Sequence, residues 1–126
     1  MPALGANFPM ALDESGGVIA AVFRSPATFV LLDVQSGAIK TQIGTCGDAD
    51  DVFFDARRKR AYVSCGDGSV DVLERSDGGY RPRARIKTKE GARTALFVPE
   101  LDRLFVAARA GFLGKRASIL VFRPAP

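Results

Sequence analysis

The tripeptide Cys-Gly-Asp occurs twice, at residues 46–48 and 65–67, and it contains the only two cysteines of the chain. A disulfide between Cys46 and Cys65 would close a loop of about 20 residues and stabilise the fold by roughly 3 kcal/mol in an oxidising compartment. Two unpaired thiols would instead be small apolar side chains of the core, as free cysteines often are. The sequence leaves both states open.

The same two loops could also carry a reaction. A thiolate near Arg24 or Arg109 would have a lowered pKa and could act as a nucleophile. Two thiolates together with Asp48, Asp50 or Asp67 could hold a divalent metal ion. The chain contains no histidine, which excludes a Ser-His-Asp triad and a histidine zinc site within one chain. The sequence identifies no cofactor, and a divalent metal or no cofactor are the two cases that we consider.

Four aspartates, Asp48, Asp50, Asp51 and Asp55, form an acidic run that enters an apolar segment. Alternation along a strand would direct Asp51 and Asp55 to the face opposite Asp48 and Asp50. Carboxylates at a channel mouth suit calcium or magnesium, but the spacing is not that of an EF-hand. We therefore favour solvated turn aspartates over a hard-metal site.

These residues lie within a threefold repeat. An apolar run, a polar turn and a second apolar run recur at residues 10–23, 52–65 and 95–108. Leu12, Phe54 and Phe97 are equivalent, at spacings of 42 and 43 residues. This period suits the four-stranded blade of a β-propeller, and the Gly, Asp and Pro punctuation argues against helices. Further strands are expected at residues 28–34, 69–73 and 118–122, and outer strands at residues 38–43 and 80–87 only.

We therefore predict an all-β fold, a β-propeller portion of three four-stranded blades whose last blade is incomplete. One half-propeller domain covers residues 1–126, with blades at about 6–47, 48–91 and 92–126. Three blades would expose apolar end faces, so we expect a homodimer that completes a six-bladed ring, or else a chain that is part of a longer propeller. Residues 1–5 form the only segment that is spare to donate a strand.

Charge is distributed unevenly along the chain. Residues 1–55 hold two basic and seven acidic side chains, whereas residues 56–126 hold sixteen and seven. The two parts therefore carry about −5 and +9, which favours head-to-tail association of two copies.

Basic residues alternate with others over residues 81–89, so all five charges are expected on one face of an outer strand. We interpret them as protection of a sheet edge. Aromatic side chains are not interleaved with them, which argues against binding of nucleic acid. The basic run at residues 57–60 is predicted to be a solvated hairpin turn on the opposite rim.

The predicted site lies on one rim of the propeller. Loops that enter the innermost strand and loops that join the second and third strands reach the same rim, so their polar residues should converge. The candidate catalytic residues are Cys46, Cys65, Asp48 and Asp50, and the candidate ligand-binding residues are Asn7, Arg24, Asp67, Arg93 and Arg109. Pairing Phe54 with Ala61 would place Asp50 opposite Cys65.

The segment Tyr62-Val63-Ser64-Cys65, together with residues 32–39, resembles the YVTN-type propeller repeat. Over the whole chain the sequence is most similar to the C-terminal half of bacterial YncE-like proteins, with residues 46–55 and 97–105 as the most specific pieces. The resemblance implies an exported or periplasmic parent, although residues 1–5 do not look like a signal peptide. Related propellers include lactonases and other hydrolases.

Three functions remain open on this basis. The first is a propeller that binds a small molecule, peptide or protein at the rim with the Cys-Gly-Asp loops. The second is a hydrolase of ester, lactone or phosphoester bonds that uses rim cysteines or carboxylates, with or without a metal. The third is a pure scaffold. No apolar run approaches the roughly 18 to 20 residues that span a bilayer, so no membrane span is predicted.

Overall fold

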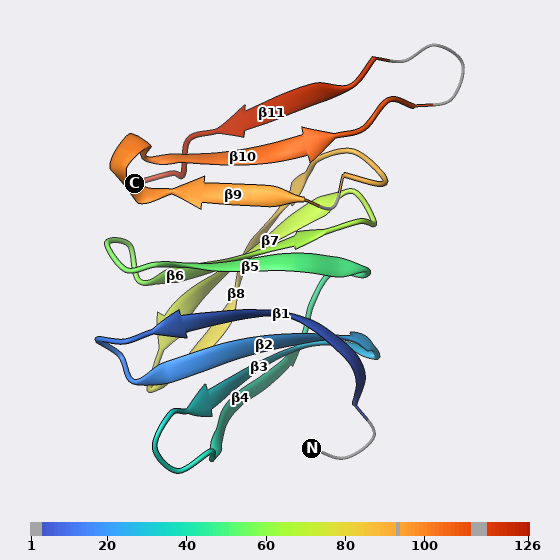
Figure 1. Cartoon of the computed structure of the whole chain (residues 1–126). Helices are drawn as coiled ribbons and strands as arrows, with labels where there is room; N and C mark the ends of the chain where they lie inside the picture. Colours follow the sequence, from blue (N-terminus) through green and yellow to red (C-terminus); the bar gives the residue numbers. More distant parts are fainter. Residues whose placement is uncertain (1–3, 93, 112–115) are drawn as a thin grey trace.

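The computed structural model describes residues 4–92, 94–111 and 116–126, except for the side chains of Asn7 and Phe8. The strands in this part of the chain form three antiparallel sheets, and it contains no α-helix. Figure 1 shows the sheets stacked one after another, with their first strands, β1, β5 and β9, side by side along one side of the stack. The fold is all-β, as the sequence predicts. A membrane-spanning helix is absent from the described residues.

The three sheets differ in strand number. Sheet 1 contains β1 (Gly5–Asp13), β2 (Val18–Ser25), β3 (Ala27–Asp33) and β4 (Ile39–Gly44). Sheet 2 contains β5 (Ala49–Asp55), β6 (Arg60–Cys65), β7 (Ser69–Ser76) and β8 (Gly79–Lys87). Sheet 3 contains only β9 (Ala95–Val98), β10 (Arg103–Ala108) and β11 (Ser118–Phe122), with a 3-10 turn, η1 (Pro99–Leu101), after β9. The predicted hairpins are confirmed, and no described residues pair with the outer side of β11, as predicted.

Two apolar cores hold the stack together. Sheets 1 and 2 bury a cluster that includes Val22, Phe29, Leu31, Val63 and Leu73. Sheets 2 and 3 bury a second cluster, with the rings of Tyr62 and Phe97 packed edge to face at 5.2 Å between centroids. Strand β6 lies between the two cores and is buried along its whole length. Its polar groups are buried with partners, since Arg60 and the Tyr62 hydroxyl are hydrogen-bonded within the fold.

The repeat keeps one register in all three sheets. Leu12, Phe54 and Phe97 pair across their hairpins with Ile19, Ala61 and Leu104. Phe54 and Phe97 pack into the core that their sheet shares with the preceding sheet, and Phe97 is 7% exposed. Leu12 is 54% exposed because no described sheet precedes sheet 1. Leu12 therefore occupies a position that is in the core of the other two sheets, but no sheet packs on it among the described residues.

At the other end of the stack, too, side chains are exposed although their equivalents in sheet 2 are buried. Strand pairing makes Ile119 equivalent to Val70 and Val121 equivalent to Val72. Val70 is 1% exposed in the core with sheet 3, whereas Ile119 is 60% exposed. Leu96 and Val121 are exposed on the same sheet. Both ends of the stack therefore present side chains of core type to solvent.

The expectation that the basic residues of β8 share one face is wrong. The register between β7 and β8 shifts midway along the pair, which breaks the alternation. Arg81 and Arg83 both reach the carboxylate of Glu74 at 3.0 Å. Arg85 instead makes two hydrogen bonds, of 2.6 and 3.0 Å, to Asp71. Strand β8 is the charged outer strand of its sheet, as expected.

Candidate functional site

The disulfide rim is the end of the stack that carries the turns at residues 44–48, 65–69 and 88–92, on the right in Figure 1. Cys46 precedes β5, Cys65 ends β6, and a disulfide joins them with their Cα atoms 5.9 Å apart. Both residues are buried. Of the states left open by the sequence, the structure contains the disulfide. Both sulfurs and an Asp67 carboxylate oxygen lie within 4.8 Å of one another. A thiolate nucleophile or a thiolate metal ligand would require reduction of the disulfide.

The two Cys-Gly-Asp loops are hydrogen-bonded to each other. The Gly66 amide donates to the Asp48 carbonyl at 2.8 Å, and the Asp67 amide donates to the Gly47 carbonyl at 3.2 Å. The Asp67 carboxylate accepts hydrogen bonds from the Gly47 amide at 2.9 Å and from the Ser69 hydroxyl at 2.6 Å. Asp67 therefore acts here as a loop-fixing residue, and its side chain still reaches solvent.

Asp71 of β7 fixes the loop at Thr45 and Cys46. The sequence analysis did not identify this residue. Its Oδ2 accepts hydrogen bonds from the Cys46 amide at 2.8 Å and the Thr45 hydroxyl at 3.0 Å, in addition to the Arg85 bonds. The carboxylate is buried, and a buried carboxylate with this many donors is a strong positional constraint. The sequence indicated this role only through one charged residue between Val70 and Val72 in β7.

Arg24 at the end of β2 reaches across from sheet 1 to sheet 2. Its guanidinium donates to the Ala49 carbonyl at 2.8 Å and to Asp50 Oδ1 at 3.2 Å, and lies 3.5 Å from Asp48 Oδ1. Cys65 pairs with Ala49 rather than with Asp50, so the predicted register is wrong by one residue. A β-bulge at Asp50 is the reason, because the extra residue is displaced from the ladder and its carboxylate turns toward Arg24. The side chains of Arg24, Asp48 and Asp50 are each about one-third exposed or less.

Asp51 points to the other side of β5. Its Oδ2 accepts a hydrogen bond from the Ala95 amide of sheet 3 at 2.7 Å. Burial, and secondarily the charge of Asp50, raises the pKa of the Asp51 carboxyl above its ordinary value. The predicted separation is confirmed, because Asp48 and Asp50 face Arg24 while Asp51 faces sheet 3.

Arg109 follows β10 on the same rim and is exposed. Its guanidinium lies against the turn at Gly91, where a Cβ atom would come within 3.0 Å of Nε. A hollow of about 480 Å³ opens here, lined by Gly91, Thr94, Ala107, Arg109, Ser118 and Ile119. Asn7 pairs with Phe23 through its backbone, but its side chain lies outside the described residues, as does all of Arg93.

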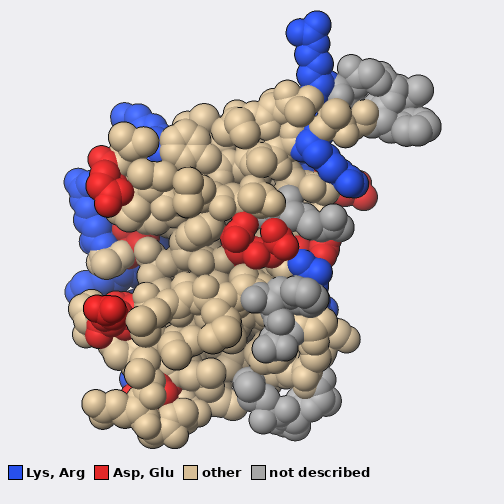
Figure 2. Space-filling model, in the orientation of Figure 1, with Lys and Arg blue, Asp and Glu red and all other residues tan. Residues whose placement is uncertain are grey.

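Figure 2 shows that acidic side chains gather over the half of β5 nearer the disulfide rim, with basic side chains beside them. Further acidic and basic side chains lie along the left edge of this view, at the opposite rim. The rim thus offers carboxylates and guanidinium groups within one region, at the side of the stack where the first strands lie. Such a mixed region could bind a polar ligand through charge-assisted hydrogen bonds.

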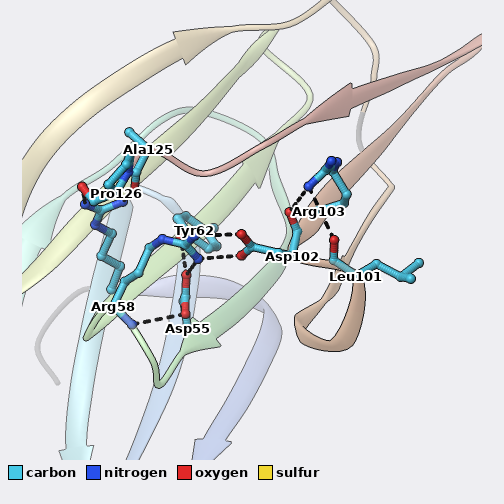
Figure 3. Close-up of polar contacts among 9 residues, drawn as sticks. Asp55, Arg58, Tyr62, Leu101, Asp102, Arg103, Ala125 and Pro126 are labelled. Atoms are coloured by element: carbon cyan, nitrogen blue, oxygen red, sulfur yellow. Dashed lines mark hydrogen bonds and ion pairs between the residues drawn. The ribbon is translucent and has the colours of Figure 1, made fainter.

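The opposite rim carries a second polar cluster, shown in Figure 3. Arg58 makes ion pairs with Asp55 at 3.1 Å and with Asp102 at 2.6 Å, and the Tyr62 hydroxyl donates to Asp55 Oδ2 at 2.5 Å. Burial, assisted by the nearby Asp55 carboxylate, raises the pKa of Tyr62 well above its ordinary value. The expectation of a solvated turn at residues 57–60 is wrong for Arg58, which bridges two sheets.

Arg60 at the start of β6 is also buried. Its guanidinium donates to the carbonyl oxygens of Ala125 and Pro126 at 2.6 and 2.9 Å. Together with Arg58 it connects sheet 2 to the segments that flank sheet 3. The groups drawn in this cluster satisfy one another, which is typical of a structural network.

No family model and no curated protein matches the chain. Solved structures do. A hydrazine synthase of Kuenenia stuttgartiensis aligns over 93% of this chain and 34% of its own, with a TM-score of 0.78 and 16% identity. A candidate 6-phosphogluconolactonase of Bacteroides uniformis aligns over 95% of this chain and 37% of its own, with a TM-score of 0.71 and 18% identity. A eukaryotic initiation factor aligns over 97% of this chain and 30% of its own, with a TM-score of 0.72 and 14% identity.

The chain therefore spans about a third of the length of these neighbours. The likeness shows that the fold is propeller-like. Propeller folds carry unrelated functions, so the neighbours' activities do not follow from the fold.

Proposed function

We propose that the chain is a ligand-binding module whose site lies on the disulfide rim and is completed by a second copy of the chain. The observation that carries this proposal is the difference in exposed fraction between equivalent side chains of the three sheets. Val70 is 1% exposed whereas its equivalent Ile119 is 60% exposed, and Leu12 is exposed where Phe97 is buried. An additional sheet on each end of the stack would bury these side chains.

A homodimer supplies both additional sheets at once. Sheet 3 of each copy would pack on sheet 1 of the other, which gives a closed two-fold arrangement of six blades. The net charges of about −5 for residues 1–55 and +9 for residues 56–126 favour the same head-to-tail pairing, because these parts meet at both junctions. A longer polypeptide could supply the same cover, and the mass in solution separates the two cases.

The binding site follows from this arrangement. The hollow beside Arg109 is lined in part by Ile119, so it lies where sheet 3 would meet the second copy. Arg109 would receive an anionic group of the ligand, and the hydroxyl groups of Thr94 and Ser118 in the lining would bond to its donors. We therefore propose a small molecule or peptide that carries both a carboxylate or phosphate and amine or hydroxyl groups.

Thermal unfolding with a panel of amino acids, dipeptides and sugar phosphates tests this site. A genuine ligand should raise the midpoint of the wild-type protein, and Arg109→Glu should remove the effect. Arg57→Glu is the matched control, because Arg57 is equally exposed but lies on the opposite rim. A ligand whose effect survives Arg109→Glu, or is lost equally in Arg57→Glu, would contradict the proposed site.

The alternative function is hydrolysis of ester, lactone or phosphoester bonds. The observation that favours it is the group formed by Asp48, Asp50 and Arg24 at the disulfide rim, in which a carboxylate could act as a general base. One neighbour in fold is a candidate 6-phosphogluconolactonase. In this alternative Arg24 would stabilise developing negative charge.

Hydrolysis of nitrophenyl esters, nitrophenyl phosphates and simple lactones would test it. Rates should fall at least about 100-fold in Asp50→Asn if this carboxyl is the acid or base. Activity that appears only after reduction would instead indicate a thiolate from Cys46 or Cys65. Metal analysis of the purified protein addresses the metal-assisted form, and the absence of turnover above background would reject the alternative.

The disulfide between Cys46 and Cys65 indicates the kind of cellular compartment in which the protein works. Structural disulfides persist in oxidising compartments and are rare where thiols are kept reduced. We propose that the working protein resides in an oxidising compartment, which agrees with the exported parent implied by the YncE-like resemblance. Alkylation of free thiols in lysate that is denatured as the cells are opened should leave Cys46 and Cys65 unmodified, and their modification would contradict this placement.

A further inference from the structure

Sheet 3 leaves one strand edge unpaired in the described part of the chain. In sheets 1 and 2 the third strand pairs on its outer side with β4 or β8, whereas the outer side of β11 pairs with no described residues. An open edge offers a row of backbone donors and acceptors to another strand. The two complete sheets show what a fourth strand contributes at this position.

A fourth strand fills the space between its own sheet and the preceding sheet. Tyr80 of β8 lies between sheets 1 and 2, with its ring 6.0 Å from Phe29 and 5.9 Å from Phe54. The Tyr80 amide also donates to the hydroxyl of Thr41 in β4 at 3.0 Å. The outer strands of neighbouring sheets are thus packed against each other, and Tyr80 is 7% exposed.

The corresponding space between sheets 2 and 3 is an open cavity of about 190 Å³. We call it the edge groove. Its apolar wall is formed by Val70, Val72, Ala84, Ile86, Leu104 and Phe122. Ile86 is 39% exposed at this place. The groove is therefore apolar, partly open and directly beside the free edge of β11.

Positive charge surrounds the edge groove. Arg83 and Arg123 belong to its lining, and Arg123 follows the last residue of β11. Glu74 accepts hydrogen bonds from both Arg81 and Arg83, so one carboxylate serves two guanidinium groups. A carboxylate on an incoming strand would complement this excess of positive charge.

We infer that the free edge of β11 and the edge groove bind an extended peptide segment that pairs antiparallel with β11. The segment begins beside Phe122 and Arg123 because β11 runs toward them. It places an acidic residue at its start near Arg123 and an aromatic side chain next in the groove, as Tyr80 does between sheets 1 and 2. Backbone pairing provides affinity and the groove provides selectivity for the aromatic residue.

This binding site is distinct from the end faces that a second copy would cover. Ring closure uses the face of sheet 3 that carries Ile119 and Val121, whereas the groove lies on the opposite face, with Leu104 and Phe122. The inference therefore stands whether or not the chain forms a dimer. It goes beyond the proposed rim site, which is at another end of the strands.

The test uses a fluorescent peptide of six residues, the length of β4, with the sequence Glu-Tyr-Thr-Val-Thr-Val and blocked ends. Binding to the full chain is followed by anisotropy. Two control peptides replace glutamate by lysine or tyrosine by serine. We expect each control to bind at least about 10-fold more weakly. Equal binding of the three peptides, or no binding of the first, would overturn the inference.

Protein variants locate the binding. Ile86→Glu should weaken the glutamate peptide at least about 10-fold, because it puts a like charge in the groove. Ile39→Glu is the matched control, since Ile39 is 44% exposed on β4, the outer strand of sheet 1. Arg123→Glu should reverse the preference and favour the lysine peptide. Loss of binding in Ile39→Glu but not in Ile86→Glu would contradict the assignment.

Hydrogen exchange on the protein without peptide addresses the competing occupant. If a strand of a second copy fills the groove, the amides of β11 are already protected and the peptide adds nothing. That result would overturn the assignment to an acidic aromatic segment. Protection of β11 that appears only with the glutamate peptide supports it.

Discussion

Arg58, in the turn between β5 and β6, donates two hydrogen bonds to the carboxylate of Asp102, at 2.6 and 2.8 Å (Figure 3). The two residues are 44 positions apart and belong to neighbouring sheets. The hydrogen bonds from Arg58 lower the pKa of Asp102. The Arg58 guanidinium also donates to the buried Asp55. The contact fixes sheet 3 against sheet 2 at the rim opposite the disulfide.

Asp55→Ala should lower the free energy of unfolding by about 2 to 3 kcal/mol, because Tyr62 and Arg58 would lose their buried acceptor. Asp102→Ala should cost less, because Asp102 is more exposed and Arg58 would keep Asp55 as a partner. Urea unfolding measures both changes. Arg57→Ala, an exposed change in the same turn, is the control and should be nearly neutral. A larger loss for Asp102→Ala than for Asp55→Ala would contradict this ranking.

Reduction of the disulfide should lower the free energy of unfolding by about 3 kcal/mol, because a closed loop of about 20 residues is released in the unfolded chain. The double variant with Cys46→Ala and Cys65→Ala should show a similar loss without reductant. Its unfolding curve should not respond to reductant at all. Identical wild-type curves with and without reductant would show that the bond is absent or contributes nothing.

Gly68→Ala should destabilise the disulfide rim more than Gly78→Ala does. Both glycines have positive φ, of 98° and 82°, so both variants should lose about 1 kcal/mol through backbone strain. A Cβ atom at Gly68 would also lie 2.9 Å from the Glu90 backbone nitrogen, whereas nothing lies within 4 Å at Gly78. This crowding should add about 1 to 3 kcal/mol. Equal melting temperatures for the two variants would mean that the turns are not in contact.

Asp51→Asn should change the pH dependence of stability. The folded-state pKa of Asp51 is raised above its ordinary 3.8, so the native state holds its proton more tightly than the unfolded state. Wild-type stability should therefore fall relative to the variant as pH rises from about that ordinary value through the folded pKa. The asparagine can still accept the bond from Ala95. Paired denaturation curves from pH 3 to 7 measure the difference, and a constant difference would show that Asp51 is not perturbed.

The sequence predicts much of the fold because repeated residues carry repeated roles. Leu12, Phe54 and Phe97 were aligned from spacing alone, and their strand pairs confirm the alignment. The absence of an outer strand on sheet 3 among the described residues also agrees with the prediction. The convergence of Arg24 with the Cys-Gly-Asp loops followed from the same repeat logic.

The errors arise where one residue departs from alternation. The bulge at Asp50 moved Cys65 opposite Ala49, and the bulge near Arg83 divided the basic residues of β8 between two partners. Each displaced residue finds a charged partner that lies elsewhere in the fold. Strand periodicity contains no information about such partners, which is also why the bridge from Arg58 to Asp102 was interpreted as a solvated turn.

The mass of the purified chain in solution decides whether two copies complete the rim site. We expect twice the 13.5 kDa of one chain, by light scattering coupled to gel filtration at micromolar concentration. Leu12→Glu and Ile119→Glu should each reduce the mass to that of one chain, because each puts a charge at a proposed junction. A folded wild-type protein of 13.5 kDa at the same concentration would contradict the composite site.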